Sequence, residues 1–190
     1  SPEESVELSL AAAGFELQLF AAEPDIVNPV AFAWDDRGRL FVLETVDYPN
    51  EVRTGEAGDD RIIICEDTDG DGRADKFTPF AEGFNIPTSL TPIDGGWVVA
   101  QAPHFLFLKD TDGDDRADVR YVLNEGWGIR DTHAGPSNLR YGHDNRIWGA
   151  VGYSGVENST QGRFGQGVFR MNPDDGVVEP VGLFSNNTWG

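Results

Sequence analysis

The chain has 190 residues and a formal net charge of −19 at pH 7, with 14 Lys and Arg against 33 Asp and Glu. A chain of this length can bury the core of one domain. Because the cations are few and form no cluster, we exclude nucleic acid and anionic membrane surfaces as partners.

Hydropathy and cysteine content set two further limits. No stretch approaches the roughly 18 consecutive apolar residues of a membrane span, so we expect no direct membrane insertion by this chain. The single cysteine, Cys65, cannot form a disulfide within the chain, and its place in the apolar run 61–65 predicts a buried core residue. No signal peptide is present, which indicates a chain that is cytoplasmic, already processed or cut from something longer.

The N-terminus predicts a short helix. Ser1 and Glu4 form a capping box, Pro2 suits the first turn and Gly14 can end the helix. After it, short runs of β-branched, aromatic and leucine residues are separated by Asp, Gly, Asn and Pro, which is typical of strands. We therefore expect residues 1–27 to hold the helix and a strand that leads into the first repeat.

Three similar units follow, beginning at Pro29, Pro87 and Pro136. Each starts with a strand, a turn and a second strand, and each continues into another hairpin. The strands of these second hairpins are expected at 62–65 and 76–81, at 105–108 and 119–123, and at 167–171 and 177–184. Four short strands with a period of about 50 residues are typical of a β-propeller blade.

We therefore predict an all-β fold, a single-domain partial β-propeller with about three four-stranded blades of a larger ring and a short N-terminal helix. The blades are expected at 28–84, 85–127 and 128–185, and residues 186–190 as the start of a truncated next blade. An all-β sandwich is the alternative, but its strands would not recur in fours with a matched turn. Three blades leave an open edge, so the remaining blades of the ring are expected partners.

Two Asp-rich loops share one pattern, with carboxylates at loop positions one, three, five and nine and a main-chain carbonyl at position seven. Calcium takes six to eight oxygen ligands at about 2.3–2.6 Å, and alternating Asp side chains converge when the backbone curls. We therefore expect two calcium ions. The candidate ligands are Asp67, Asp69, Asp71, Arg73 and Asp75 in the first loop, and Asp110, Asp112, Asp114, Arg116 and Asp118 in the second.

The two loops depart from the EF-hand pattern in two ways. Gly72 permits the sharp turn at position six of the first loop, whereas Asp115 at the same position strains the second turn or changes its path. Position twelve is Thr78 or Tyr121, so the bidentate Glu is missing. Plain acidic turns are the alternative, but four Asp within nine residues would repel one another without a cation. We expect the calcium to be a structural staple.

The three histidines are His104, His133 and His143. His143 lies in a hairpin turn, where we expect a solvated surface residue. His133 directly precedes the first strand of the third unit, and in propellers such loops line the central channel; His104, in a strand connection, is a weaker candidate for the same mouth. A His close to an Asp, here Asp131, can act as a general base near neutral pH. The alternative for His133 is an ordinary hydrogen-bonding loop histidine.

The sequence resembles the N-terminal propeller of large planctomycete proteins described as membrane-bound dehydrogenases or haem-binding CxxCH proteins. The resemblance covers nearly the whole chain and rests on motifs that occur in order, at 28–44, 47–49, 60–62, 66–75, 101–104, 132–137 and 152–155. It implies a cytochrome c module in the full-length protein as electron acceptor. Haem is not expected in this fragment, which has no CxxCH. The resemblance also implies a periplasmic or extracellular location, with any membrane association through other parts of the full-length protein.

That family is in turn similar to soluble glucose and sorbosone dehydrogenases, six-bladed propellers that use pyrroloquinoline quinone. The order of residues around their catalytic His is matched by His133, Gly135, Leu139, Gly142, Ile147 and Trp148. The resemblance implies that His133 takes the hydroxyl proton of a sugar or alcohol while hydride passes to the quinone. Those enzymes favour an acidic residue that supports the His where this chain has 152–154.

The expected function is therefore the calcium-binding propeller of a quinoprotein-type sugar or alcohol dehydrogenase, with the quinone as its cofactor. The basic residues that would hold the quinone are expected in later blades, so no cofactor-binding residue is assigned. The alternative is a non-catalytic, calcium-stabilised propeller that binds carbohydrate or scaffolds other modules, because one fold hosts many activities.

Overall fold

The computed structural model describes residues 1–50, 52 and 57–184. It confirms a nearly all-β chain with one short helix, α1 (Pro2–Leu8), which carries the expected capping box between Ser1 and Glu4. The helix ends well before Gly14, since it buries no residue and only its cap stabilises it. Nothing helical in the described chain has the length and apolar character that a membrane span requires. The segment 186–190, expected to begin a further blade, lies outside the described residues.

Fourteen strands follow the helix within the described ranges. They are β1 (Pro29–Trp34), β2 (Leu40–Glu44), β3 (Asp60–Glu66), β4 (Lys76–Phe84), β5 (Ser89–Ile93), β6 (Gly96–Gln101), β7 (His104–Lys109), β8 (Val119–Glu125), β9 (Pro136–Tyr141), β10 (Ile147–Val151), β11 (Val156–Ser159), β12 (Gly162–Phe164), β13 (Gly167–Met171) and β14 (Val178–Leu183).

The strands form three antiparallel meanders, as the repeat predicts. Sheet 1 is β1-β2-β3-β4, sheet 2 is β5-β6-β7-β8, and sheet 3 is β9-β10-β13-β14. A short hairpin, β11–β12, joins sheet 3 beside β14, where the sequence indicated no strands because the segment is polar and only three or four residues pair. The strand expected within residues 1–27 does not form; that segment crosses sheet 1, and Phe20 O accepts a backbone bond from Ala74 N–H in the β3–β4 loop.

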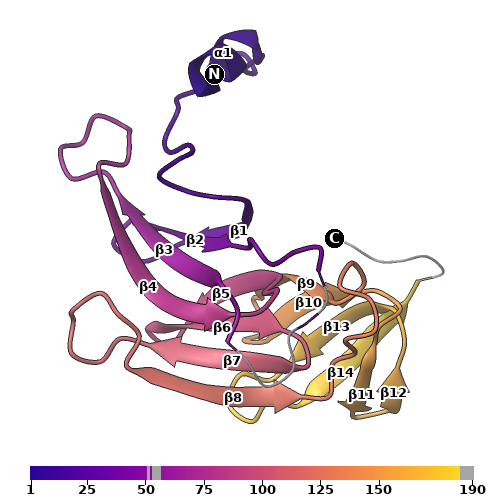
Figure 1. Ribbon diagram of the computed structural model, residues 1–190. Coiled ribbons are helices and arrows are strands. Elements are labelled where there is room, and N and C mark those ends of the chain that lie inside the picture. Colours follow the sequence, from indigo (N-terminus) through magenta and orange to yellow (C-terminus); the bar gives the residue numbers. More distant parts are fainter. Residues whose placement is uncertain (51, 53–56, 185–190) are drawn as a thin grey trace.

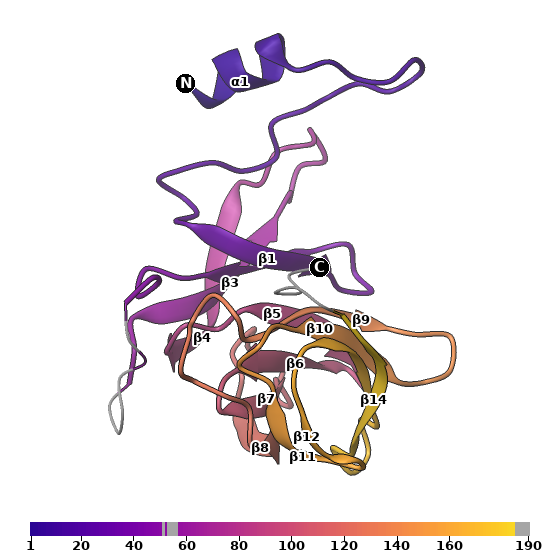
Figure 2. The ribbon, with the colours of Figure 1, turned by 90° about the vertical axis from the view of Figure 1, so that its right-hand side faces the viewer.

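The sheets pack face to face with their first strands side by side (Figures 1 and 2). The Ser89 hydroxyl accepts from Leu139 N–H, and the Thr88 hydroxyl donates to Pro136 O, so β5 and β9 are fastened to each other. Consecutive four-stranded meanders in this order are propeller blades, and the sandwich alternative is wrong.

Two apolar layers separate the sheets. Between sheets 1 and 2, Phe41 stacks on Trp97 with ring centroids 4.2 Å apart. Between sheets 2 and 3, Phe105 stacks on Trp127 at 4.5 Å and contacts Phe169. Sheet 2 lies between the two layers and is therefore buried on both faces. Because strand side chains alternate between faces, its inner strands β6 and β7 are apolar at nearly every position.

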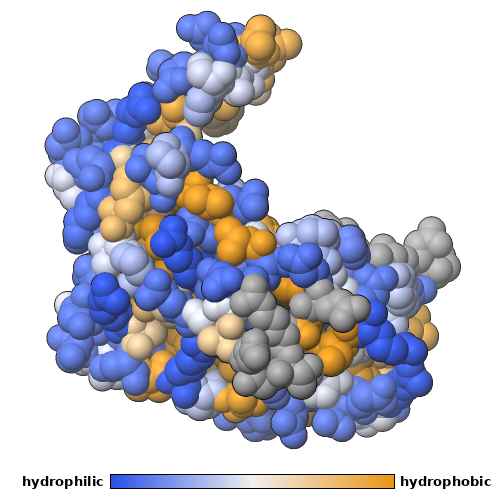
Figure 3. All heavy atoms as spheres, in the orientation of Figure 1, coloured by the Kyte–Doolittle hydropathy of each residue, from blue (hydrophilic) through white to orange (hydrophobic). Residues whose placement is uncertain are grey.

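The outer face of sheet 1 is apolar; it is buried over β2 and β3 and exposed over β1. Cys65 lies there, fully buried as predicted, and burial is the main cause that raises the pKa of its thiol to about 12. Phe20 and Ile26 of the N-terminal segment cover part of the face. Phe32 on β1 stays 62% exposed, and Figure 3 shows apolar atoms gathered over this strand.

We predict that Phe105→Ala lowers the free energy of unfolding by about 3–5 kcal/mol, because it empties the layer that joins sheets 2 and 3. Tyr121→Ala on the neighbouring strand is the matched control, since Tyr121 is half exposed and its loss should cost less than about 1 kcal/mol. Urea denaturation measures both. Equal losses in the two variants would contradict a core joined at Phe105.

Candidate functional sites

The first Asp loop connects β3 to β4 and curls around its own first carboxylate. Asp67 accepts hydrogen bonds from the N–H groups of Gly70 (2.7 Å), Asp71 (3.2 Å) and Gly72 (2.8 Å). These bonds, that of Gly72 first, lower the pKa of Asp67, so the loop holds a fixed negative charge. One carboxylate oxygen each of Asp67, Asp69 and Asp71 then lies within 4.8 Å of the others.

The second Asp loop connects β7 to β8 and repeats this geometry. Asp110 accepts from the N–H groups of Gly113 (2.7 Å) and Asp115 (2.9 Å). Oxygens of Asp110, Asp112 and Asp118 lie within 4.8 Å of one another. Both loops project from the same end of the sheets (Figure 1), which we call the Asp-loop end.

The structure thus brings together part of each expected ligand set. Asp75 is engaged by Thr68, whose hydroxyl donates to it at 2.7 Å, and Asp118 is engaged in the same way by Thr111 at 2.6 Å. Asp114 accepts from Arg116 N–H at 2.9 Å and lies outside the convergent three. An all-oxygen, anionic donor set of this kind fits calcium, which tolerates variable geometry.

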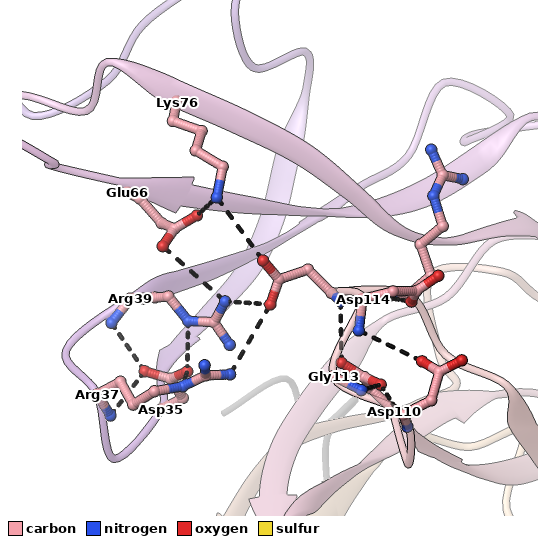
Figure 4. A network of polar contacts seen from close by, with 11 residues as sticks. Asp35, Arg37, Arg39, Glu66, Lys76, Asp110, Gly113 and Asp114 are labelled. Atoms are coloured by element: carbon pink, nitrogen blue, oxygen red, sulfur yellow. Dashed lines mark hydrogen bonds and ion pairs between the residues drawn. The ribbon is translucent and has the colours of Figure 1, made fainter.

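Asp115 fastens the second loop to sheet 1. It adopts a left-handed backbone, with φ of 66°, which Asp tolerates better than most residues. Its carboxylate lies 2.6 Å from Arg39 Nη1, 3.7 Å from Lys76 Nζ and 3.8 Å from Arg37 Nη2 (Figure 4). The Arg39 guanidinium is the main cause that lowers the pKa of Asp115. The side chain of Asp115, which stands where the first loop has Gly72, therefore joins sheet 2 to sheet 1.

Arg39 is the centre of this network. It is only 10% exposed, and its Nε lies 2.8 Å from Asp35 in the β1–β2 turn. Glu66 at the end of β3 lies 3.9 Å from Arg39 and 2.6 Å from Lys76 at the start of β4. Three elements of sheet 1 and one loop of sheet 2 therefore meet at one buried cation.

Position eight of each loop makes an equivalent backbone bond. Ala117 N–H donates to Phe80 O on β4, and Ala74 N–H donates to Phe20 O in the N-terminal segment, both at 2.8 Å. Each loop is thus attached to the preceding part of the chain: the second loop to β4 of sheet 1, and the first loop to the N-terminal segment. This arrangement suits the expected role of a staple.

His133 lies at the other end of the sheets, in the segment that leads into β9. Its backbone N–H donates to Asp131 Oδ1 at 2.8 Å, and its Nδ1 lies 3.2 Å from the same oxygen. The Tyr153 hydroxyl donates to Asp131 Oδ2, and the Ser154 hydroxyl donates to Asp131 O at 3.1 Å. The Tyr48 ring meets the imidazole edge-on at 5.1 Å.

The support of His133 differs from that implied by the resemblance. The carboxylate comes from Asp131, two residues upstream, while Tyr153 and Ser154 hold that carboxylate and its backbone. The Tyr153 hydroxyl is the main cause that lowers the pKa of Asp131, so a negative charge faces the imidazole at neutral pH. Proximity in sequence was the available signal for Asp131; the resemblance pointed to the segment 152–154, but Tyr153 is not the acidic residue that it implies.

Tyr48 lies beside His133 because the buried Asp60 carboxylate holds the residues that precede Tyr48 in the chain. Asp60 is 1% exposed and accepts four hydrogen bonds, from the Thr45 hydroxyl and from the N–H groups of Val46, Asp47 and Ile86 at 2.6–2.9 Å. One buried carboxylate thus fixes the β2–β3 loop to the connection between sheets 1 and 2. Sequence reasoning missed both Asp60 and Tyr48.

The other two histidines stand on other elements of the fold. His143 is in the β9–β10 turn, and six residues of extended chain separate the two ends of β9 by about 20 Å. His143 therefore belongs to the Asp-loop end. His104 starts β7 and pairs with Gln101 and Glu125 in sheet 2.

We predict that chelation lowers the melting temperature of the calcium-loaded protein by about 5–10 °C, because an ion at roughly 100 times its Kd contributes about 2.7 kcal/mol. Combining Asp69→Ala with Asp112→Ala should abolish the shift, and Asp174→Ala, an acidic residue of the ordinary β13–β14 turn, should preserve it. Scanning calorimetry with and without EGTA measures all three. A shift of the same size in the double variant would contradict binding in the loops.

We predict that Asp115→Asn lowers the free energy of unfolding by about 2–4 kcal/mol, because it leaves Arg39 buried without its closest partner. Asn tolerates the left-handed backbone, so the change tests charge and not strain. Arg37→Met is the control, since Arg37 is exposed and should contribute less than about 1 kcal/mol. Denaturation in urea, which is uncharged and does not screen ion pairs, measures both; an unchanged midpoint in Asp115→Asn would refute the clamp.

Comparison with known proteins gives one family and several partial structural likenesses. No protein of curated function matches the sequence. A glucose dehydrogenase-type oxidoreductase from Thermus thermophilus is 21% identical, with a TM-score of 0.45 over 75% of this chain and 44% of that one. The PQQ-bound aldose sugar dehydrogenase of Streptomyces coelicolor is 17% identical, with a TM-score of 0.43 over 75% and 43%. A protein of unknown function from Dyadobacter fermentans is 16% identical, with a TM-score of 0.42 over 76% and 37%.

The chain therefore spans less than half the length of the solved structures that it matches. The sequence model of the domain of unknown function DUF7133 matches residues 1–190, so the chain belongs to the DUF7133 family.

Proposed function

We propose that this chain is the calcium-binding propeller domain of a quinoprotein-type sugar or alcohol dehydrogenase, in which His133 is the general base. The observation that carries the proposal is the contact between the His133 imidazole and the Asp131 carboxylate, on an accessible loop. A neighbouring carboxylate orients an imidazole and stabilises the cation that forms when it accepts a proton. The order of residues from His133 to Trp148, which resembles that of the soluble dehydrogenases, supports the same role.

The proposed chemistry is the oxidation of an alcohol to a carbonyl. His133 accepts the hydroxyl proton while the carbon loses hydride, so that two electrons and one proton leave the substrate as hydride and the second proton stays on the imidazole. Pyrroloquinoline quinone, when bound, would supply the two-electron acceptor. General base catalysis of this kind contributes about 10²–10⁴-fold.

The segment that precedes His133 would meet one edge of such a quinone. A hollow next to it is lined by Pro49, Asn50, Val52, Ile129, Arg130, Asp131 and Thr132. Arg130 is the cation of this lining and suits one carboxylate of the quinone. The other cations that the cofactor requires are assigned to later blades, so no cofactor-binding residue of this chain is proposed as essential.

The remaining parts of the proposal concern the whole protein. Calcium would be held by Asp67, Asp69 and Asp71 and by Asp110, Asp112 and Asp118, and would fasten the Asp-loop end. The partners are the remaining blades of a six-bladed ring and a cytochrome c module that takes the electrons. The location is periplasmic or extracellular.

A second candidate is a non-catalytic propeller that is stabilised by calcium and binds carbohydrate or scaffolds other modules. It is favoured by the position of the two Asp loops. Both loops bond to preceding parts of the chain and lie at the opposite end of the sheets from His133. In that case His133 is a loop histidine held by Asp131.

We predict that the full-length protein, reconstituted with calcium and pyrroloquinoline quinone, reduces an electron-accepting dye in the presence of at least one sugar of a panel, whereas this chain alone is expected to be inactive. His133→Ala should lower kcat by about 10²–10⁴-fold because the proton then has no acceptor, while His143→Ala should leave kcat unchanged. Steady-state dye reduction measures both. No turnover with any sugar, or full turnover in His133→Ala, would favour the non-catalytic candidate.

A further inference from the structure

The loops around His133 fix one carboxylate more firmly than they fix the imidazole itself. Asp131 Oδ1 accepts from His133 N–H, and Asp131 Oδ2 accepts from the Tyr153 hydroxyl. Its backbone carbonyl accepts from the Ser154 hydroxyl. Both side-chain oxygens and the main chain of this residue are therefore held, from the segment before β9 and from the loop after β10.

A carboxylate held in this way selects one tautomer of the neighbouring ring. An ionised Asp can only accept hydrogen bonds, so the His133 nitrogen that faces it must carry the proton. That nitrogen is Nδ1, 3.2 Å from Asp131 Oδ1. In the neutral ring the lone pair then lies on Nε2. Among the residues that the structure describes, none forms a hydrogen bond with Nε2, so this atom is available to a substrate.

The contacts on the other side of the ring limit its rotation. The Tyr48 ring packs edge-on against the imidazole, with centroids 5.1 Å apart and the planes at 63°. Tyr48 stands on the loop that the buried Asp60 organises, since the Asp60 carboxylate accepts from the N–H groups of the two residues that precede Tyr48, Val46 and Asp47. If the ring rotated by half a turn, Cδ2 would face Asp131 in place of Nδ1. The charge-assisted hydrogen bond would then be lost.

We propose that Asp131 and Tyr153 are positioning residues that hold His133 as its Nδ1–H tautomer, so that Nε2 is the atom that accepts the substrate proton. The roles of the two differ. Asp131 selects the tautomer directly, and Tyr153 acts through Asp131 by holding its second oxygen. This inference deepens the proposed function and rests on it for the identity of the proton that moves, while the tautomer itself is independent of any cofactor.

The test combines a spectroscopic readout with kinetics. Long-range ¹H–¹⁵N spectra of the ¹⁵N-histidine-labelled protein, at about pH 8.5 where an ordinary imidazole is neutral, distinguish the two tautomers. The sequence has only three histidines, so His104→Ala and His143→Ala assign the signals. We expect His133 to be mainly Nδ1–H in the wild type and mainly Nε2–H in Asp131→Ala, which removes the acceptor, and Tyr153→Phe to give a mixture.

The kinetic arm uses the same variants of the full-length protein with calcium, quinone and a sugar that the wild type oxidises. Asp131→Ala should lower kcat by about 10²–10⁴-fold with KM nearly unchanged, because the ring loses the acceptor that keeps its lone pair on Nε2. Tyr153→Phe should lower kcat by about tenfold, the equivalent of one hydrogen bond. Asp174→Ala in the β13–β14 turn is the matched control and should change neither readout. Melting curves identify any variant that fails to fold, in which case Tyr153→Phe carries the test.

The outcomes separate this inference from the proposed function. An Nε2–H tautomer of His133 in the wild type, or the same tautomer ratio in Asp131→Ala and Tyr153→Phe as in the wild type, would overturn the inference even if the protein oxidises sugars. A wild-type protein without turnover would overturn the proposed function, while the tautomer spectra would still decide whether Asp131 positions the ring.

Discussion

The ion pair between Arg39 and Asp115 is the constraint on which the rest of the Asp-loop end depends. Arg39 is almost buried between sheets 1 and 2, and a guanidinium in that position is costly unless carboxylates surround it. Asp35 and Glu66 come from sheet 1 itself, but Asp115 comes from the neighbouring sheet. Since desolvation offsets much of the attraction, the pair contributes more to the fixed placement of sheet 2 on sheet 1 than to net stability. Asp115 N–H also donates to Asp110, so an ion that orders the loop carboxylates would hold the clamp in place as well.

The two ends of the sheets carry different kinds of contact. At the Asp-loop end, charged turns are attached to the neighbouring chain by side-chain and backbone bonds. At the other end, three connections from different sheets meet at His133, and buried Asp60 fixes one of them. The stacked aromatic layers between the ends are closely packed and hold the loops at constant separation. A rigid scaffold of this kind lets loops carry chemistry without losing geometry.

Local features could be predicted from the sequence, and contacts between units could not. The capping box of Ser1, the hairpins and the curled Asp loops each depend on residues within about ten positions of one another. Asp115 was recognised as a departure from Gly, but its partner Arg39 lies 76 residues away, so only the packing of two sheets reveals the pair. Tyr153 is separated from Asp131 by 22 residues and two strands. The hairpin β11–β12 was missed because its polar strands pair through backbone groups, which leave no hydropathy pattern.

The outer face of sheet 1 is exposed only over β1, and this exposure follows from the same packing rules. Phe32 pairs with Val42 in sheet 1 as Leu90 pairs with Val99 in sheet 2, so the two residues occupy equivalent places. Leu90 is 1% exposed because sheet 1 covers it, whereas Phe32 is 62% exposed. Burying a side chain of this size contributes about 1.5–3 kcal/mol, a strong drive toward a partner. The first Asp loop bonds to Phe20 O where the second bonds to Phe80 O of β4, so the chain at Phe20 takes the place of an outer strand. The exposed face at Phe32 and the first Asp loop therefore repeat two features of the interface between sheets 1 and 2. This repetition favours a further four-stranded blade as the element that covers β1 in the proposed ring.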